Sequence, residues 1–544
     1  MSEVSAFFRL PETGAGNPPA FSDAAGCKAW LATLPIANAA QSQALLLRQL
    51  DLLNAFSLTT AERLRIAELL RDPITACQEG SVKRFAGKPL PLGPAEAAGF
   101  ESTHLLWQAL ATTYLHCLAA TLASPDDPRG QAQLALLAQR ILATMSAARI
   151  DALQGGHLPS AESWRVAVGV FLAAERRNSA TLEVEDRIRY GHAPTTAAAG
   201  FAEIVLIRLA APHEFGPRQL GWVFRWARRW AGKVRVLPEP PSEAKSPPLC
   251  VDLGADDVPG RDAAHSSAPR WLDIGDLRSS VKKRLIKLAA GELPAAIGLG
   301  EDCVMPAAEM VLRHVYQHWC KGEGGRRRER QSATGACRLV GGFEAIHAHL
   351  SGKAFVQPTQ GAALSRQQHE EIATFGRIAS HHLEEQQTRE PIVEEWTVAE
   401  EWRDADEGSR GLIVLRPPAQ AGVRLSAGQL VALRPDGASQ ILLGILRWVY
   451  SDGEDTLRAS VQSLPGFPAP AAVRGTGLAA INDKYRTAFF LPEVPVLRQP
   501  QRIVLPPGMF RTGLVLEVRG DPPRQCRLVE LRERGSDFDC ATWQ

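Results

Sequence analysis

Residues 322–330 read Gly-Glu-Gly-Gly-Arg-Arg-Arg-Glu-Arg, and this stretch divides the chain into two halves of different character. Before it, apolar residues recur at steps of three and four, as they do along one face of a helix. After it come short apolar or β-branched runs that Pro, Gly, Asp and Ser separate. The sequence therefore predicts a multidomain α+β protein, with an all-α N-terminal region followed by small antiparallel β-units.

The helical half shows its periodicity in several segments. Leu46, Leu50 and Leu53 share one face, and Thr59 followed by Glu62 matches a capping box that opens the next helix. Further helices are predicted for the alanine- and leucine-rich segments 104–123, 130–150, 161–175, 196–209, 274–288 and 306–319. Helices with such stripes pack pairwise into an all-α domain.

The β half shows short strand patterns. In a small antiparallel β-barrel we expect strands at 336–340, 392–398, 411–415, 429–433, 441–450 and 456–463. A C-terminal β-unit is predicted from runs at 488–491, 501–505, 513–519 and 525–531.

Shifts in composition then give the domain boundaries. We expect an α-helical N-terminal domain (1–236), a linker (237–270) with a short strand at 249–253, a second helical block (271–320), a β-barrel (321–480) with a helical insertion at about 347–391, and a C-terminal β-unit (481–544).

Composition excludes several classes of protein. The formal charge is only +2, from 61 basic and 59 acidic residues, so bulk nucleic-acid binding is not expected. The nine cysteines form no Cys-x-x-Cys pair, and an odd number of scattered cysteines fits a reducing cytoplasm. No stretch of about 18 apolar residues occurs, and the N-terminus lacks the features of a signal peptide, so neither membrane spanning nor secretion is expected.

The arginine stretch is the first candidate site. Its four arginines are Arg326, Arg327, Arg328 and Arg330, and they follow three glycines. Arginine presents a planar fork of donors that binds phosphate bidentately and stacks on nucleobases. The stretch therefore suits a phosphorylated purine better than a metal, although a solvated run of charge is the alternative.

A second polar cluster precedes the strand at 411–415. It contains Asp406, Gly408, Ser409 and Gly411. An Asp carboxylate can accept hydrogen bonds from the N1 and N2 donors of guanine, and glycines let the backbone approach a ring closely. The alternative interpretation is an Asp/Gly turn between two strands.

The two clusters together resemble the paired signature of PilZ domains, which is Arg-x-x-x-Arg before a β-barrel and Asp-x-Ser-x-x-Gly within it. Arg326 to Arg330 matches the first motif, and Asp406 to Gly411 is similar to the second, with Gly408 where the family has serine. Residues 423–433 and 443–448 resemble two further strands of that family. Over its full length the chain is similar to the long FimW-type proteins of proteobacteria, which are implicated in type IV pilus function and surface attachment.

The resemblance implies a receptor for the bacterial second messenger cyclic di-GMP. Arg326, Arg327 and Arg330 would clamp the phosphates and the Hoogsteen edges of the guanines. The other guanine edge would be held by Asp406, Gly408, Ser409 and Gly411. No cofactor beyond this ligand is implied, and a protein of the pilus or envelope machinery is the implied partner. An insertion between Arg330 and Asp406 departs from the family pattern, as does Gly408.

We therefore expect a cytoplasmic receptor, open to recruitment to a cell pole or envelope complex, that couples the messenger to surface attachment, biofilm formation or pilus function. No Gly-x-Ser-x-Gly elbow, Walker loop or Gly-x-Gly-x-x-Gly turn occurs, so an enzyme is not expected. One alternative is a scaffold or chaperone-like protein whose PilZ-like barrel has lost its ligand. Another is a single-strand-binding protein that uses the tryptophans and arginines of residues 222–230.

Two further motifs favour structural interpretations. The tryptophans of residues 222–230 are expected in the core, with the arginines reaching solvent. His314 and His318 stand at the i, i+4 spacing that zinc can use, with Cys320 close by. Since no His-Glu-x-x-His carboxylate accompanies them, a structural helix end is expected there, and no metal.

Overall fold

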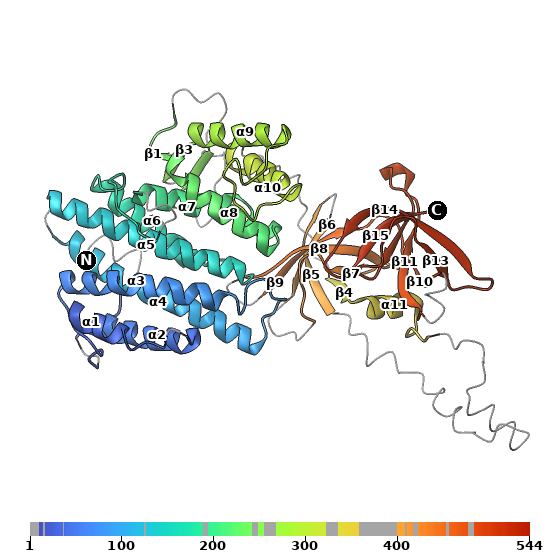
Figure 1. Ribbon diagram of the computed structural model, residues 1–544, viewed down its shortest axis with the longest axis horizontal. Helices are drawn as coiled ribbons and strands as arrows, with labels where there is room; N and C mark the ends of the chain where they lie inside the picture. The colour runs from blue at the N-terminus through green and yellow to red at the C-terminus, as the bar shows by residue number, and fades with distance from the viewer. Residues whose placement is uncertain are drawn as a thin grey trace, which may run out of the picture. The chain divides into compact units, whose positions relative to one another are not determined.

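A computed structural model of the chain divides it into two compact units, Met1–Arg328 with Tyr450–Glu454, and Glu329–Val449 with Asp455–Gln544. We call them the helical unit and the barrel unit, and each is described by itself (Figure 1). The structure describes residues 10–14, 17–35, 37–124, 127–188, 194–241, 249–254, 268–321, 336–357, 400–408, 411–416, 423–452, 456–476 and 483–544, with backbone alone for 400–408 and 411–413.

The helical unit begins with a bundle in which long helices run side by side (Figure 1). Its helices are α1 (Ala24–Leu31), α2 (Ala39–Ala55), α3 (Thr60–Val82), α4 (Pro94–Leu122), α5 (Pro128–Gln154), α6 (Ala161–Arg176), α7 (Ala197–Leu209) and α8 (Pro217–Trp230). The Thr59 half of the predicted capping box is confirmed, because its hydroxyl accepts from the Glu62 backbone N–H at 3.3 Å. The Glu62 carboxylate accepts from the Ala24 N–H at 2.7 Å, and so joins the start of α3 to α1.

A second block of the helical unit combines a small sheet with two helices. The sheet has the order β1 (Arg235–Leu237), β3 (Pro269–Asp273), β2 (Leu249–Asp252), and β3 is antiparallel to both neighbours. The helices are α9 (Gly275–Ala289) and α10 (Ala307–Tyr316), and α10 continues into a short π-helix at Gln317–Lys321. Leu277, Leu312 and Trp319 of this block share one hydrophobic core with the bundle. The predicted strand at 249–253 is confirmed as β2, whereas β1 and β3 were not predicted.

The barrel unit starts with a closed antiparallel barrel. Its strands are β4 (Ala336–Gly341), β5 (Glu400–Gly408), β6 (Gly411–Arg416), β7 (Leu430–Pro435), β8 (Leu442–Ser451) and β9 (Leu457–Ser463). They follow the order β4-β5-β6-β9-β8-β7 around the barrel. Helix α11 (Phe343–Ser351) packs on it, at the start of the predicted insertion. Residues 358–391 of that insertion and the strand expected at 392–398 lie outside the described residues.

The C-terminal β-unit is a second closed barrel. Its strands are β10 (Ala469–Gly475), β11 (Arg486–Leu491), β12 (Arg502–Leu505), β13 (Val515–Val518), β14 (Arg524–Arg534) and β15 (Asp539–Trp543), in the order β10-β11-β12-β15-β14-β13. Leu430 and Leu443 of the first barrel form one buried cluster with Phe489, Val504 and Phe538 of the second. The fold class, helical N-terminal region followed by a small antiparallel barrel and a C-terminal β-unit, is confirmed, while the domain boundaries stay a prediction.

Candidate ligand site

The second sequence motif lies on the hairpin that joins β5 to β6. Asp406 is opposite Ile413 in the register, and Gly408 is opposite Gly411 as the last pair before the loop. A register shift falls between Asp404 and Asp406, which is the sign of a β-bulge. Bulges bend a strand and redirect its side chains, often next to functional sites. The structure thus places Asp406, Gly408 and Gly411 on one tight hairpin at an end of the first barrel, while Ser409 lies outside the described residues.

The chain enters β4 at the same end of this barrel. Strand β4 is antiparallel to β5, and its first residue, Ala336, is opposite Arg403. The start of β4 therefore adjoins the half of β5 that runs toward Asp406 and Gly408. Arg330 precedes Ala336 by a segment that spans at most about 20 Å when extended, and Arg403 to Gly408 covers about 17 Å of strand. The arginine stretch is thus attached within reach of the hairpin.

The arginines themselves are not placed. Arg326, Arg327 and Arg330 lie outside the described residues, so the structure fixes only the point at which their segment joins the barrel. What the topology brings together is a hairpin with an Asp and two glycines and the attachment point of a cluster of guanidinium groups. Arginine forks suit guanine O6 and N7 and phosphate oxygens, and a carboxylate suits guanine N–H donors. The two motifs are therefore chemically complementary to different parts of a guanine nucleotide.

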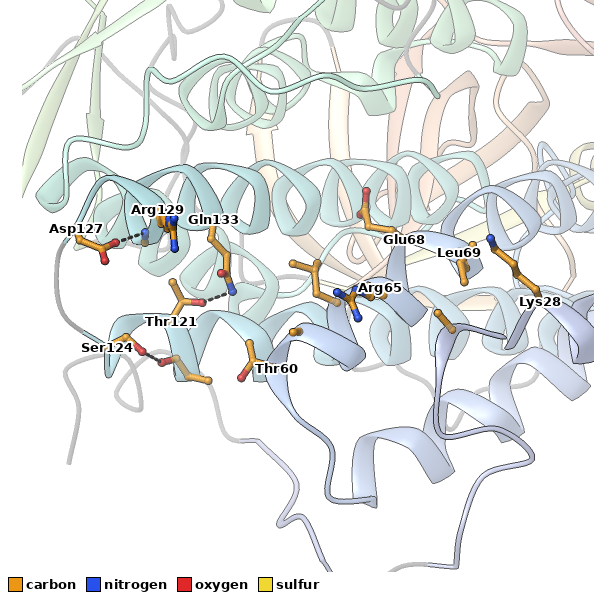
Figure 2. Close-up of a pocket in the computed structure, with 15 residues that line it drawn as sticks. Lys28, Thr60, Arg65, Glu68, Leu69, Thr121, Ser124, Asp127, Arg129 and Gln133 are labelled. Carbon is orange, nitrogen blue, oxygen red and sulfur yellow. Dashed lines mark hydrogen bonds between the residues drawn. The ribbon is translucent and has the colours of Figure 1, made fainter. Parts of the chain in front are cut away.

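A groove in the helical unit is a second place that could hold a ligand (Figure 2). Its volume is about 870 Å³, and residues of α1, α3, α4 and α5 line it. Its acids are already engaged, because Glu68 accepts from Arg140 at 2.9 Å and from the Tyr114 hydroxyl at 2.7 Å, and Asp127 caps the Gly130 N–H at 2.7 Å. Lys28 and Arg129 are exposed on its rim, and neither forms an ion pair among the residues that the structure describes.

Sequence reasoning did not find this groove. Lys28, Arg65 and Arg129 belong to three different helices, and no local spacing joins them. Only the packing of α1, α3 and α5 brings them to one groove. Arg65 is paired with Glu62 at 3.1 Å, which leaves Lys28 and Arg129 as the cations that suit an anion and makes the groove a suitable control for the barrel site.

The histidines at the end of α10 have structural roles, as predicted. His314 Nε2 lies 3.0 Å from the Ala210 carbonyl oxygen, and His318 Nδ1 lies 2.9 Å from that of Leu209. Burial and the neighbouring His314 lower the pKa of His318 to about 4, so its ring is neutral at pH 7. Within the described part of the chain, no cluster of His, Cys, Asp or Glu is arranged to hold a metal ion.

The tryptophans of α8 lie in the core, which confirms the structural interpretation of residues 222–230. Trp222, Trp226 and Trp230 are each no more than 1% exposed. Of the arginines between them, Arg225 pairs with Asp302 and Arg228 with Glu203, while Arg229 donates to the Gly298 carbonyl. Single-strand binding by this helix is therefore contradicted, because buried indoles cannot stack on bases.

All nine cysteines lie in the described residues, and they are buried and form no disulfide bond. Burial raises the pKa of the Cys117 and Cys320 thiols to about 12, although a nearby arginine acts against this in each case. Thiols with such pKa values are poor nucleophiles, so these two cysteines serve packing. In the part of the chain that is described, none of the helices combines the length and the apolar character needed to cross a bilayer.

Two models of known protein families match this chain, one near each end. Residues 24–241 match a family model described as the cyclic-di-GMP receptor FimW, N-terminal domain, and residues 471–542 match one described as the FimW C-terminal beta-barrel domain. The first match covers the bundle from α1 to β1, and the second covers the second barrel almost completely. The curated proteins and the solved structures contain no match. The predicted membership is therefore confirmed, and the chain belongs to the family of the cyclic di-GMP receptor FimW.

Proposed function

We propose that this protein binds cyclic di-GMP at the end of the first barrel where the β5–β6 hairpin and the start of β4 meet. The observation that carries the proposal is the antiparallel pairing of β4 with β5, with Ala336 opposite Arg403. This pairing puts Ala336, the first residue of β4, on the side of Arg403 that leads along β5 to Asp406, and the arginine motif precedes Ala336 in the sequence. Membership in a family of cyclic di-GMP receptors supports the choice of ligand.

Each motif has its own part in the proposed site. Arg326, Arg327 and Arg330 bind phosphate oxygens and guanine O6 and N7 through their paired donors. The N–H groups of the other guanine edge donate to Asp406 and Ser409. Gly408 and Gly411 leave room for a ring against the backbone. Binding draws the arginine stretch against the hairpin, and no cofactor and no bond-breaking step are needed.

The proposed role is that of a cytoplasmic receptor and not of an enzyme. The bound state engages a partner in the pilus or envelope machinery, at a pole or envelope complex, and so links the messenger to attachment and biofilm formation. A ligand-free scaffold or chaperone-like protein is the second candidate. It is favoured by Gly408, which lacks the hydroxyl of the PilZ pattern, and by the insertion before β5.

Titration calorimetry of the full chain with cyclic di-GMP tests the proposal. We expect saturable binding that weakens by about tenfold or more in Arg326→Ala/Arg330→Ala and in Asp406→Ala, because each variant removes charge-assisted hydrogen bonds. The matched control is Lys28→Ala/Arg129→Ala, which removes two cations from the groove of the helical unit.

The control variant should bind like the wild type. Loss of binding in the groove variant alone would move the site to the helical unit. If the wild type shows no saturable binding, the receptor proposal is wrong and the scaffold remains. Pull-down of envelope proteins that is equally efficient with and without the messenger would support that scaffold.

A further inference from the structure

Helix α9 packs on the helical unit through one face, and it lies at the outer edge of that unit (Figure 1). Leu277, Val281 and Leu288 are buried on the inner face. Arg284 also turns inward, because its guanidinium lies 5.2 Å from the centre of the Trp230 ring and its Nε donates to the Ile297 carbonyl at 3.1 Å. Arg278 donates to the Cys320 carbonyl at 2.9 Å. The arginines of α9 thus belong to the internal structure.

The lysines of α9 lie on the opposite face. Lys282, Lys283, Ile286 and Lys287 are all exposed, at the spacing of neighbours on one helix face. Lys282 and Lys283 form no ion pair or hydrogen bond with any residue in the described ranges, and Lys287 pairs with the exposed Glu292 at 3.1 Å. This face therefore offers cationic charge that the described residues do not fully neutralise.

Large apolar side chains lie among these lysines and just beyond them. Ile286 is 59% exposed, and Leu293, four residues after the end of α9, is 70% exposed. Val304, Met305 and Met310 are also exposed, in the loop before α10 and in its first turn. Five of the thirteen exposed large hydrophobic residues in the described part of the chain fall within residues 286–310. Single exposed apolar residues are ordinary, but Ile286 on the same helix face as unpaired lysines, with Leu293 shortly after the helix, points to an interaction surface.

The residue types on this surface indicate what kind of partner it binds. Nucleic acid is usually recognised through arginine forks and aromatic stacking, and here the arginines face inward and the exposed apolar residues are aliphatic. A helix whose exposed face carries lysines and aliphatic side chains suits the plane of an anionic lipid surface, where the charges meet headgroups and the apolar groups enter the acyl boundary. We propose that the outer face of α9, with Leu293, docks on an anionic phospholipid membrane.

Co-sedimentation of the full chain with vesicles tests this docking. We expect binding to vesicles of phosphatidylcholine mixed with phosphatidylglycerol, weak binding to phosphatidylcholine alone, and loss of binding as salt is raised. Lys282→Glu/Lys283→Glu should weaken binding by about tenfold or more, because each lysine near an anionic surface contributes separately. Ile286→Ser/Leu293→Ser should weaken it as well, without changing the net charge.

The matched control is Lys83→Glu/Lys88→Glu, which makes the same change of net charge at two other exposed lysines. It should sediment like the wild type. Equal loss in the control, equal binding to both kinds of vesicle, or no binding of the wild type would each overturn the proposal; in the last case an acidic protein would become the candidate partner. Far-ultraviolet circular dichroism confirms folding, and unchanged messenger titration of Lys282→Glu/Lys283→Glu keeps this test independent of the barrel site.

Discussion

Arg71 and Asp186, which are 115 residues apart in the sequence, form a bidentate ion pair inside the helical unit. The distances are 2.9 Å from Nη1 to Oδ1 and 3.0 Å from Nη2 to Oδ2. Both side chains are buried, and Gln139 donates to Asp186 Oδ2 at 2.9 Å. The pair therefore joins the segment after α6 to α3 and α5.

Removal of one side chain of the Arg71–Asp186 pair should lower the free energy of unfolding strongly. Asp186→Ala leaves the Arg71 guanidinium buried without its counter-ion, and we expect the free energy of unfolding to fall by roughly 3–5 kcal/mol. Urea denaturation followed by tryptophan fluorescence measures it. The matched control is Glu309→Ala, which breaks the exposed pair between Glu309 and Arg313 on α10 and should cost less than about 1 kcal/mol. Equal effects of the two substitutions would contradict the role of the buried pair.

The same carboxylate predicts a loss of stability in acid. Burial alone would raise the pKa of Asp186, but the hydrogen bonds and charge of Arg71 outweigh it and lower the pKa from 3.8 to about 2. Because the folded-state pKa is the lower one, the stabilisation is present above about pH 4 and is lost as the pH falls toward 2. In the wild type, the urea concentration at the midpoint of unfolding should therefore decrease as the pH is lowered from 4 to 3. Asp186→Ala should show a smaller fall over the same interval.

His318 predicts a second, separate pH dependence. Its pKa is lowered from 6.5 to about 4, first by burial and then by His314. Between these values the unfolded chain binds the proton and the folded chain does not, so stability should decrease as the pH falls from 6.5 toward 4. His318→Asn removes the titration and keeps a donor for the Leu209 carbonyl, so its urea midpoint should change less between pH 7 and pH 5. Parallel curves for the two proteins would disprove the assignment.

Gly535 is tightly enclosed in the barrel unit. A Cβ atom there would lie 2.1 Å from Phe538 Cε1 and 2.4 Å from the Gly428 carbonyl oxygen. Phe538 is fully buried in the core that the two barrels share. Gly535→Ala should therefore cost about 1–3 kcal/mol through overpacking, as measured by urea denaturation. Gly221→Ala is the control, because no atom lies within 4 Å of its Cβ and alanine favours helix α8, so this variant should be slightly more stable. A Gly535→Ala protein as stable as the wild type would show that Phe538 can shift at little cost.

Local pattern was sufficient for most elements of the fold but not for all. The helices of the bundle followed from apolar periodicity, and the strands from short β-branched runs between turn residues. Strand β5 was not predicted, because residues 400–408 contain five acidic side chains and only pairing with β4 and β6 makes them a strand. Strand β10 was missed as well, since Pro470 and its alanines give a weak strand pattern.

Only part of the candidate site could be predicted, because local pattern shows turns but not long-range strand pairing. The turn signals around Gly408 and Gly411 do indicate a hairpin, and that hairpin is present. Ala336 and Arg403 lie opposite each other in paired strands, but a long insertion separates them in the sequence. No local pattern therefore predicts their pairing. It is this long-range pairing that puts the start of β4 at the end of the barrel toward which β5 runs to Asp406.

Gly408 offers a direct test of how the hairpin holds guanine. Residue 408 lies at the end of β5, opposite Gly411, where extended backbone tolerates serine. Gly408→Ser restores the hydroxyl of the PilZ pattern, and one added hydrogen bond should tighten cyclic di-GMP binding by about fivefold. Ser409→Ala should weaken binding by a similar factor if that hydroxyl now serves the guanine.

The double variant Gly408→Ser/Ser409→Ala tests whether guanine binding uses a hydroxyl at one of these two positions or at both. It moves the hydroxyl from residue 409 to residue 408, the last residue of β5. If position 408 faces the ligand and Ser409 only compensates through the loop, the double variant should bind at least as tightly as the wild type. Titration calorimetry of the four proteins measures the series. Equal affinities throughout would mean that neither hydroxyl contacts the guanine, which would leave Asp406 as the side-chain acceptor proposed for its N–H groups.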